Sequence, residues 1–164
     1  MMGFLIAALV LMLVAGPVLW LKPSKGEARR TQLRLLARGL GLQVRLCNLP
    51  QVRRARVRRE DARQGIVYLL PVPEPGKLKP IEYCLTRENG SSPWEADESD
   101  ALPADLQLVV DRIASAVPAD VVAIGLNPQG PALYWRERGD EATVRSLAQW
   151  LQALRNAMLA TLKA

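Results

Sequence analysis

The stretch DVVAIGLNPQGPALYWRER, residues 120–138, places two apolar runs on either side of the turn sequence NPQG. Asn-Pro and glycine interrupt regular structure and favour a reversal of the chain, so the stretch predicts a β-hairpin. Side chains alternate between the two faces of a strand, so one of Tyr134 and Trp135 should point into the core. We interpret this aromatic pair as core packing rather than as a platform for a ligand.

Helical patterns flank the hairpin on both sides. The first should begin near Pro103, a residue suited to the first helical position, and it carries one apolar face: Leu106, Val109, Val110, Ile113 and Val117. The second should begin after Asp140, a good N-cap, and should run to about Leu162. Its apolar stripe has helical spacing: Val144, Leu147, Leu151, Leu154 and Met158.

Three further segments towards the N-terminus have the character of strands. Residues 42–47 alternate between apolar and polar side chains, and residues 81–87 alternate again. Residues 65–72, GIVYLLPV, form a continuous apolar run that is typical of a buried strand. Residues 88–101 are acidic and rich in turn formers, and they predict a solvated loop.

A basic helix should precede these strands. Leu33, Leu36, Ala37 and Leu40 share one helical face, and Gly41 is a plausible C-terminal cap. The order of elements predicts an α+β domain, with an antiparallel or mixed sheet of about five strands and three helices. We expect three parts: a single transmembrane helix in 1–22, a basic juxtamembrane helix in 23–41 and the α+β domain in 42–164.

The N-terminal stretch GFLIAALVLMLVAGPVLWL, residues 3–21, carries no charged side chain. As an α-helix it would be roughly 28 Å long, close to the ~30 Å hydrocarbon core of a bilayer. A cleaved signal peptide or a hydrophobic helix of a soluble protein would be the alternatives. Signal peptides begin with a basic region, which is missing here, so we predict an uncleaved anchor.

The flanks of this span predict its orientation. Basic residues follow the span, and only the α-amino group precedes it. Because basic flanks stay on the cytoplasmic side, we expect an outside N-terminus and a cytoplasmic domain at the bacterial inner membrane. The residues expected to touch the membrane or its lipids are Trp20, Lys22, Lys25, Arg29, Arg30 and Arg34.

A second basic group occupies QVRRARVRRED, residues 51–61. Its arginines are Arg53, Arg54, Arg56, Arg58 and Arg59. Neither face of this stretch is apolar, so we expect an exposed edge strand or a loop. Contact with anionic lipid, a solvated edge and a docking patch for an acidic partner remain open. The absence of aromatic residues argues against nucleic-acid binding.

Trp94 stands within the acidic loop, where an aromatic side chain is unusual. It is a possible contact for a partner, or it folds back onto the core.

Catalytic and cofactor motifs are missing from the sequence. The chain has no histidine and two cysteines, Cys47 and Cys84, which we interpret as small apolar residues. Phosphate-binding glycine motifs and a nucleophile elbow are absent. We therefore predict no catalytic residue, no metal, no cofactor and no enzymatic activity.

The apolar span followed by LKPSK and basic helix residues resembles the accessory subunit of the bacterial preprotein translocase. This resemblance implies a role in a translocase or envelope complex, and it covers only the N-terminal part of the chain. The sequence as a whole favours a non-enzymatic membrane protein whose domain binds a protein partner. The alternative is a membrane-tethered binder of anionic lipid or nucleic acid through the arginine-rich segment.

Overall fold

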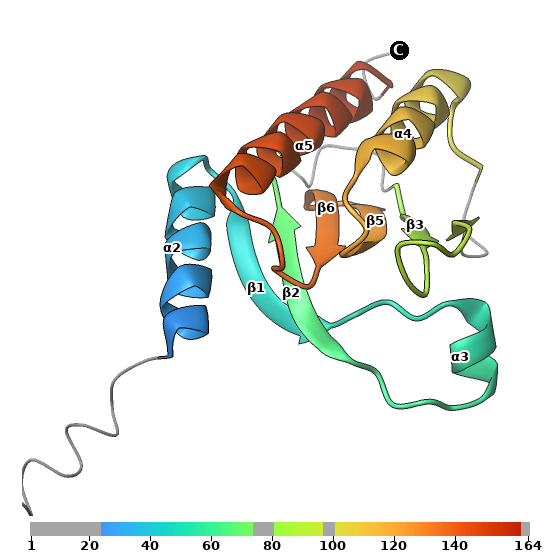
Figure 1. Ribbon diagram of the computed structural model, residues 1–164. Coiled ribbons are helices and arrows are strands. Elements are labelled where there is room, and N and C mark those ends of the chain that lie inside the picture. Colours follow the sequence, from blue (N-terminus) through green and yellow to red (C-terminus); the bar gives the residue numbers. More distant parts are fainter. Residues whose placement is uncertain (1–23, 74–80, 97–100, 162–164) are drawn as a thin grey trace, which may run out of the picture. The chain divides into compact units, whose positions relative to one another are not determined.

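The computed structural model describes residues 24–73, 81–96 and 101–161. Backbone contacts divide the chain into two units, residues 1–32 and 33–164, and the sheet lies wholly in the second unit (Figure 1). This unit is an α+β domain in which every pair of neighbouring strands is antiparallel. The predicted fold class of the domain is therefore confirmed.

The described helices are α2 (Lys25–Gly39), α3 (Arg53–Val57), α4 (Ala104–Ala116) and α5 (Glu141–Thr161). The strands are β1 (Gln43–Asn48), β2 (Gln64–Leu69), β3 (Tyr83–Thr86), β4 (Glu95–Ala96), β5 (Val121–Asn127) and β6 (Gly130–Trp135). Their order across the sheet is β1-β2-β6-β5-β3-β4, so the predicted hairpin, β5 and β6, occupies the centre.

The described part of the chain holds six strands and four helices, where about five and three were expected. The additional strand, β4, lies in the segment predicted to be a loop and pairs with Leu85 and Thr86 of β3. Two residues are too few to show an alternation in the sequence. The additional helix, α3, replaces the edge strand or loop expected for the arginine-rich stretch, and none of its residues is buried. Arginine and alanine favour helix, but a helix without a buried face leaves no apolar period to detect.

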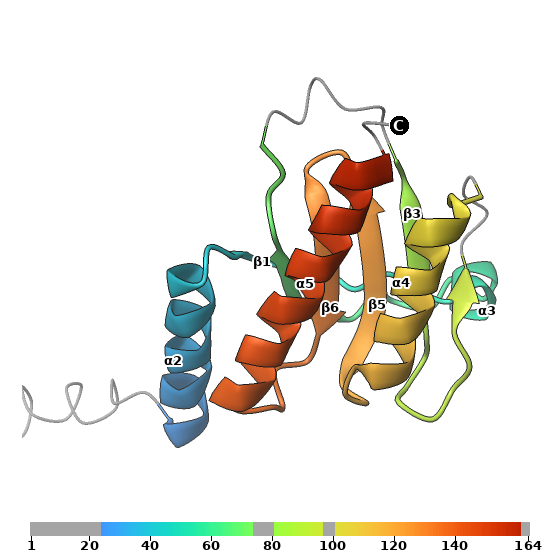
Figure 2. The same ribbon diagram turned by 90° about the horizontal axis from the view of Figure 1, so that it is seen from above.

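Helices α4 and α5 cover one face of the sheet, as Figure 2 shows. The strand register places Tyr68, Leu133, Ile124 and Leu85 in one row across this face, and all four are buried. The predicted stripe of α5 is confirmed, because each of its five residues is at most 2% exposed. The core therefore lies between the central hairpin and the two helices.

The predicted ends of two helices are also confirmed. Asp140 accepts a hydrogen bond from the backbone amide of Thr143 at 2.8 Å and so caps α5. Gly41 follows α2 with a φ of 82°, and the amide of Leu42 donates to the carbonyl of Ala37 at 3.0 Å. This is the left-handed ending that glycine permits. It turns the chain directly into β1.

The alternation expected along β6 is confirmed for its two aromatic residues. Trp135 is fully buried beneath the helices, with its ring centroid 5.3 Å from that of Tyr68. Tyr134 points to the opposite face, where it is half-buried beside Val67, Leu69 and Ala132. The two faces of the sheet thus have one aromatic residue each from adjacent positions.

The structure also describes where α2 begins. Ser24 and Glu27 form a reciprocal capping box: the Glu27 amide donates to Ser24 Oγ at 3.2 Å and the Ser24 amide donates to Glu27 Oε2 at 3.1 Å. No helix within residues 24–73, 81–96 and 101–161 has the length and apolar character needed to cross a bilayer. The predicted transmembrane helix, with Trp20 and Lys22, lies outside the described residues.

Because its tyrosines are buried or half-buried, the domain should lose stability at alkaline pH. Burial raises the pKa of Tyr68, Tyr83 and Tyr134, the three tyrosines of the chain. A tyrosine whose pKa is raised in the folded state contributes stability at pH values below its unfolded pKa of about 10. This contribution is lost as the pH rises from the unfolded pKa through the folded-state pKa. We therefore expect tyrosinate absorbance to appear together with loss of circular dichroism. Urea-unfolded protein, as the control, should titrate near pH ~10. Ionisation near that pH with the fold intact would contradict the expectation.

Candidate functional site

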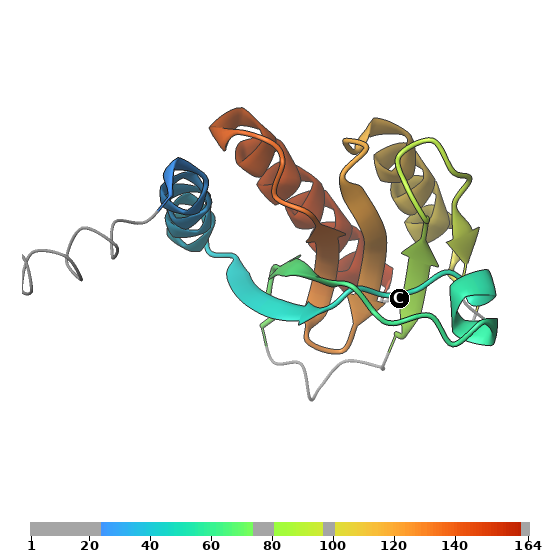
Figure 3. The same cartoon turned by 60° about the horizontal axis from the view of Figure 1, so that its bottom comes forward.

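The connection between β1 and β2, residues 49–63, leaves the sheet edge and crosses towards β3, where it forms α3 (Figure 3). Two buried side chains, Leu49 and Val52, anchor it. Leu49 lies directly over Gly65, where an added Cβ would clash with the leucine side chain. The Gln51 side chain donates to the carbonyl of Glu60 at 2.8 Å, which closes the connection upon itself.

This connection carries the arginines that the sequence grouped as a basic patch. The structure brings Arg53, Arg54, Arg56, Arg58 and Arg59 together as exposed side chains on and just after α3. Arg54 forms an ion pair with Glu88, the first acidic residue of the segment after β3, and Arg58 lies 3.9 Å from Glu60. Both pairs are more than half exposed, so each contributes little to stability.

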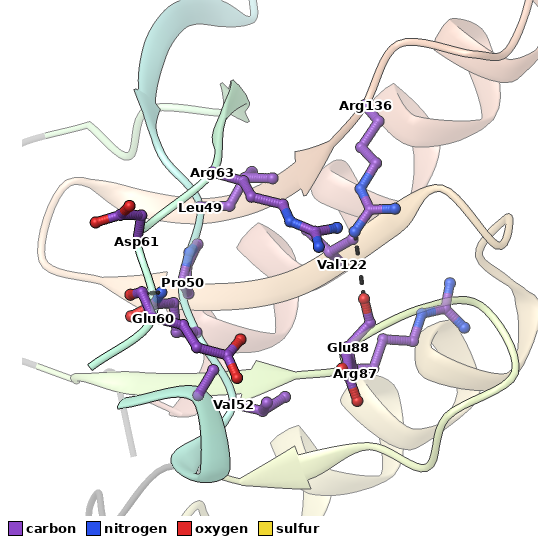
Figure 4. Close-up of a pocket in the computed structure, with 12 residues that line it drawn as sticks. Leu49, Pro50, Val52, Glu60, Asp61, Arg63, Arg87, Glu88, Val122 and Arg136 are labelled. Atoms are coloured by element: carbon purple, nitrogen blue, oxygen red, sulfur yellow. Dashed lines mark hydrogen bonds between the residues drawn. The ribbon is translucent and has the colours of Figure 1, made fainter. Parts of the chain in front are cut away.

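A small half-open cavity lies between this connection and the end of the sheet, with a volume of about 70 Å³. Its apolar lining comes from Leu49, Pro50, Val52, Ala55 and Val122. Its charged lining comes from Glu60, Asp61, Arg63, Arg87, Glu88 and Arg136. In Figure 4 the side chains of Arg63 and Arg136 point towards one another across the cavity. The sequence did not single out either arginine.

Arg87 lines the same cavity, but its guanidinium group forms hydrogen bonds that stabilise the fold. It is 7% exposed, and its guanidinium donates to the carbonyl oxygens of Val121, at 2.7 Å, and of Pro118. Burial lowers its pKa. Its guanidinium carbon lies 4.3 Å from the centre of the Trp94 ring, a cation–π arrangement. Arg87 therefore ties β3 to the segment between α4 and β5.

Trp94, the possible partner contact, packs partly buried against the core. Its Nε1 donates to the carbonyl of Ala114 at 3.0 Å, near the end of α4. Of the two arrangements expected from the sequence, the structure has the one in which the indole folds back.

Four of the residues expected to face the membrane, Lys25, Arg29, Arg30 and Arg34, lie on α2. Arg29 and Arg30 are exposed on the first half of α2, and Lys25 begins this helix. Arg34, one turn further on, instead forms a two-bond ion pair with Glu137, whose side chain is 3% exposed. Glu137 has a left-handed backbone, with a φ of 54°. No pattern in the sequence marked this glutamate as a buried residue.

Cys47 and Cys84 lie on β1 and β3, four strand spacings of about 4.8 Å apart. This separation exceeds what a disulfide spans, and neither cysteine forms one. Among the described residues, no group of three or more His, Cys, Asp or Glu side chains is arranged to hold a metal ion. No family model, curated protein or solved structure matches the chain.

Proposed function

We propose that this chain is a single-pass protein of the bacterial inner membrane whose cytoplasmic α+β domain binds another protein and has no catalytic activity of its own. The uncharged stretch of residues 3–21 and the basic residues that follow it support the membrane location and the orientation. Membership of a translocase or other envelope complex is the form of this role that the resemblance of the N-terminal segment suggests.

The edge strand β1 is the observation that supports a docking role for the domain. Leu46 lies in register with the buried residues Ile66 and Trp135, yet 68% of its surface is exposed. Edge strands usually avoid exposed apolar side chains because these invite pairing with another chain. Backbone hydrogen bonds from an edge strand, together with an apolar side chain, are the basis of recognition by strand addition. We therefore assign β1 as the docking surface.

A photo-crosslinking amino acid at position 46 tests this proposal in intact cells. We expect adducts with one defined protein in the membrane fraction, because the Leu46 side chain would face the partner. Leu108 on α4 is the matched control, since it is 65% exposed and lies away from the sheet edge. Mass spectrometry of the adducts checks the result. Equal adducts at both positions would contradict docking at β1, and a periplasmic partner would contradict the orientation.

A lipid-binding role is favoured by one further feature of α3. Val57 is 75% exposed and stands among the exposed arginines of this segment. An exposed apolar residue surrounded by cations suits the surface of an anionic membrane. The same crosslinker at position 57 distinguishes the two roles: adducts with phospholipid there, and none with protein at position 46, would favour lipid binding.

A further inference from the structure

The cavity beneath the β1–β2 connection is lined by two arginines, Arg63 and Arg136, that form no ion pair within the described residues. The Arg63 guanidinium makes no hydrogen bond or ion pair within residues 24–73, 81–96 and 101–161, although its backbone carbonyl accepts from the Leu49 amide at 2.8 Å. Arg136 donates from one guanidinium nitrogen to the Glu88 carbonyl at 3.2 Å, so further donors remain for another group.

Two of the three carboxylates that line the cavity lie against arginines of the α3 segment. Glu88 pairs with Arg54, and Glu60 lies near Arg58. Asp61 points away from the two arginines in Figure 4. Arg63 and Arg136 therefore form no ion pair with the carboxylates of the cavity in the described part of the chain.

Two guanidinium groups that point towards one another repel, unless an anion lies between them. Their position is also partly fixed: the Glu88 carbonyl holds Arg136, and the anchored connection, through Leu49, holds the backbone of Arg63. Such an arrangement costs little further ordering when an anion binds. Leu49, Pro50 and Val122 form part of the apolar lining of the same cavity.

We propose that this cavity binds a phosphate group between Arg63 and Arg136. The guanidinium fork matches phosphate geometry, and a phosphate with a charge of about −2 and three acceptor oxygens can serve two forks from different directions. The volume of about 70 Å³ is far below the ~300 Å³ of a small-molecule pocket. The site therefore holds a terminal phosphate and leaves the remainder of its carrier outside. It is separate from the docking strand β1.

Titration of the full chain, in a neutral detergent and at constant ionic strength, with inorganic phosphate tests the site. Calorimetry should show saturable binding, and Arg63→Gln should weaken it by about tenfold, the loss expected for a hydrogen bond to a charged group. Arg63→Gln is the more informative variant, because the Arg63 side chain has no hydrogen-bond or ion-pair partner in the described fold that the substitution would remove. Arg136→Lys keeps the charge, loses the fork and should also weaken binding.

Arg59→Gln is the matched control, because it removes the same charge from an exposed neighbour outside the cavity lining. Its phosphate affinity should equal that of the unaltered chain. Equal losses in Arg59→Gln and Arg63→Gln would overturn the site, because they would show binding to general surface charge. Equal affinity for acetate would overturn the assignment of phosphate, and absence of saturable binding would overturn the proposal.

Two carriers of the phosphate are separated by a further pair of titrations. A soluble phosphate ester as the natural carrier predicts that glycerol phosphate competes fully with inorganic phosphate. A lipid headgroup as the carrier predicts tighter binding of short-chain phosphatidic acid than of glycerol phosphate, again dependent on Arg63. Either result supports a phosphate site. Competition by neither compound would contradict it.

Discussion

Replacing Arg34 with alanine is expected to lower the free energy of unfolding by about 3 kcal/mol, because the change leaves a buried carboxylate without its partner. Glu137 is 5% exposed, and Arg34 donates to its two oxygens at 2.9 and 2.6 Å. The Tyr68 hydroxyl donates to Oε1 at 3.3 Å and is the other hydrogen-bond partner of this carboxylate in the described structure. The hydrogen bond to Glu137 also raises the pKa of Arg34.

The reverse change should cost less. Glu137→Gln leaves the charge on Arg34, whose side chain is 36% exposed and can turn towards water. We expect a loss of about 1 kcal/mol, that of one ordinary hydrogen bond. Urea unfolding followed by circular dichroism measures both variants. Arg38→Ala is the matched control on the same helix, because Arg38 is exposed. Equal losses for Arg34→Ala and Arg38→Ala would show that the ion pair does not stabilise the domain.

Replacing Trp135 with alanine should have the largest effect in the molecule, a loss of about 3–5 kcal/mol. The side chain is fully buried at the centre of the sheet, and its ring meets the Tyr68 ring edge-on at an interplanar angle of 76°. Small domains have a total free energy of unfolding of about 5–15 kcal/mol. The variant should therefore be partly unfolded at physiological temperature, which thermal and urea unfolding will show.

Trp135→Phe is the informative companion to this variant. The indole Nε1 is buried and has no hydrogen-bond partner in the described structure. Phenylalanine removes this unsatisfied donor while keeping a ring against Tyr68, so the loss should be below about 2 kcal/mol. A loss equal to that of alanine would mean that the indole nitrogen has an essential partner, and would contradict the packing explanation.

The features that the sequence predicted well depend on neighbouring residues. The turn NPQG, the cap at Asp140 and the glycine ending at Gly41 are each decided within a few positions. The stripe of α5 follows from the regular spacing of apolar residues over about four helical turns. These signals are strong because the residues that favour the turn, cap or helix are the same residues that form its hydrogen bonds or buried contacts.

The features that the sequence did not predict depend on register between distant segments. Arg63 and Arg136 line one cavity because β2 and β6 are neighbours in the sheet, which composition and spacing do not reveal. Glu137 looks like an ordinary surface charge until the domain places it beside Arg34 and Tyr68. Helix α3 buries none of its residues, so the sequence shows no regular spacing of apolar residues that would predict it.

The unequal ends of the described sheet limit how copies of this chain could assemble. One end offers the six residues of β1, whereas the other offers the two residues of β4, one of them the charged Glu95. Two copies joined strand to strand through β1 would form a twofold pair with a continuous sheet. In such a dimer the β1 edge of each copy would already be paired. No further copy could then add through β1, so assembly would stop at the dimer instead of continuing into a fibre.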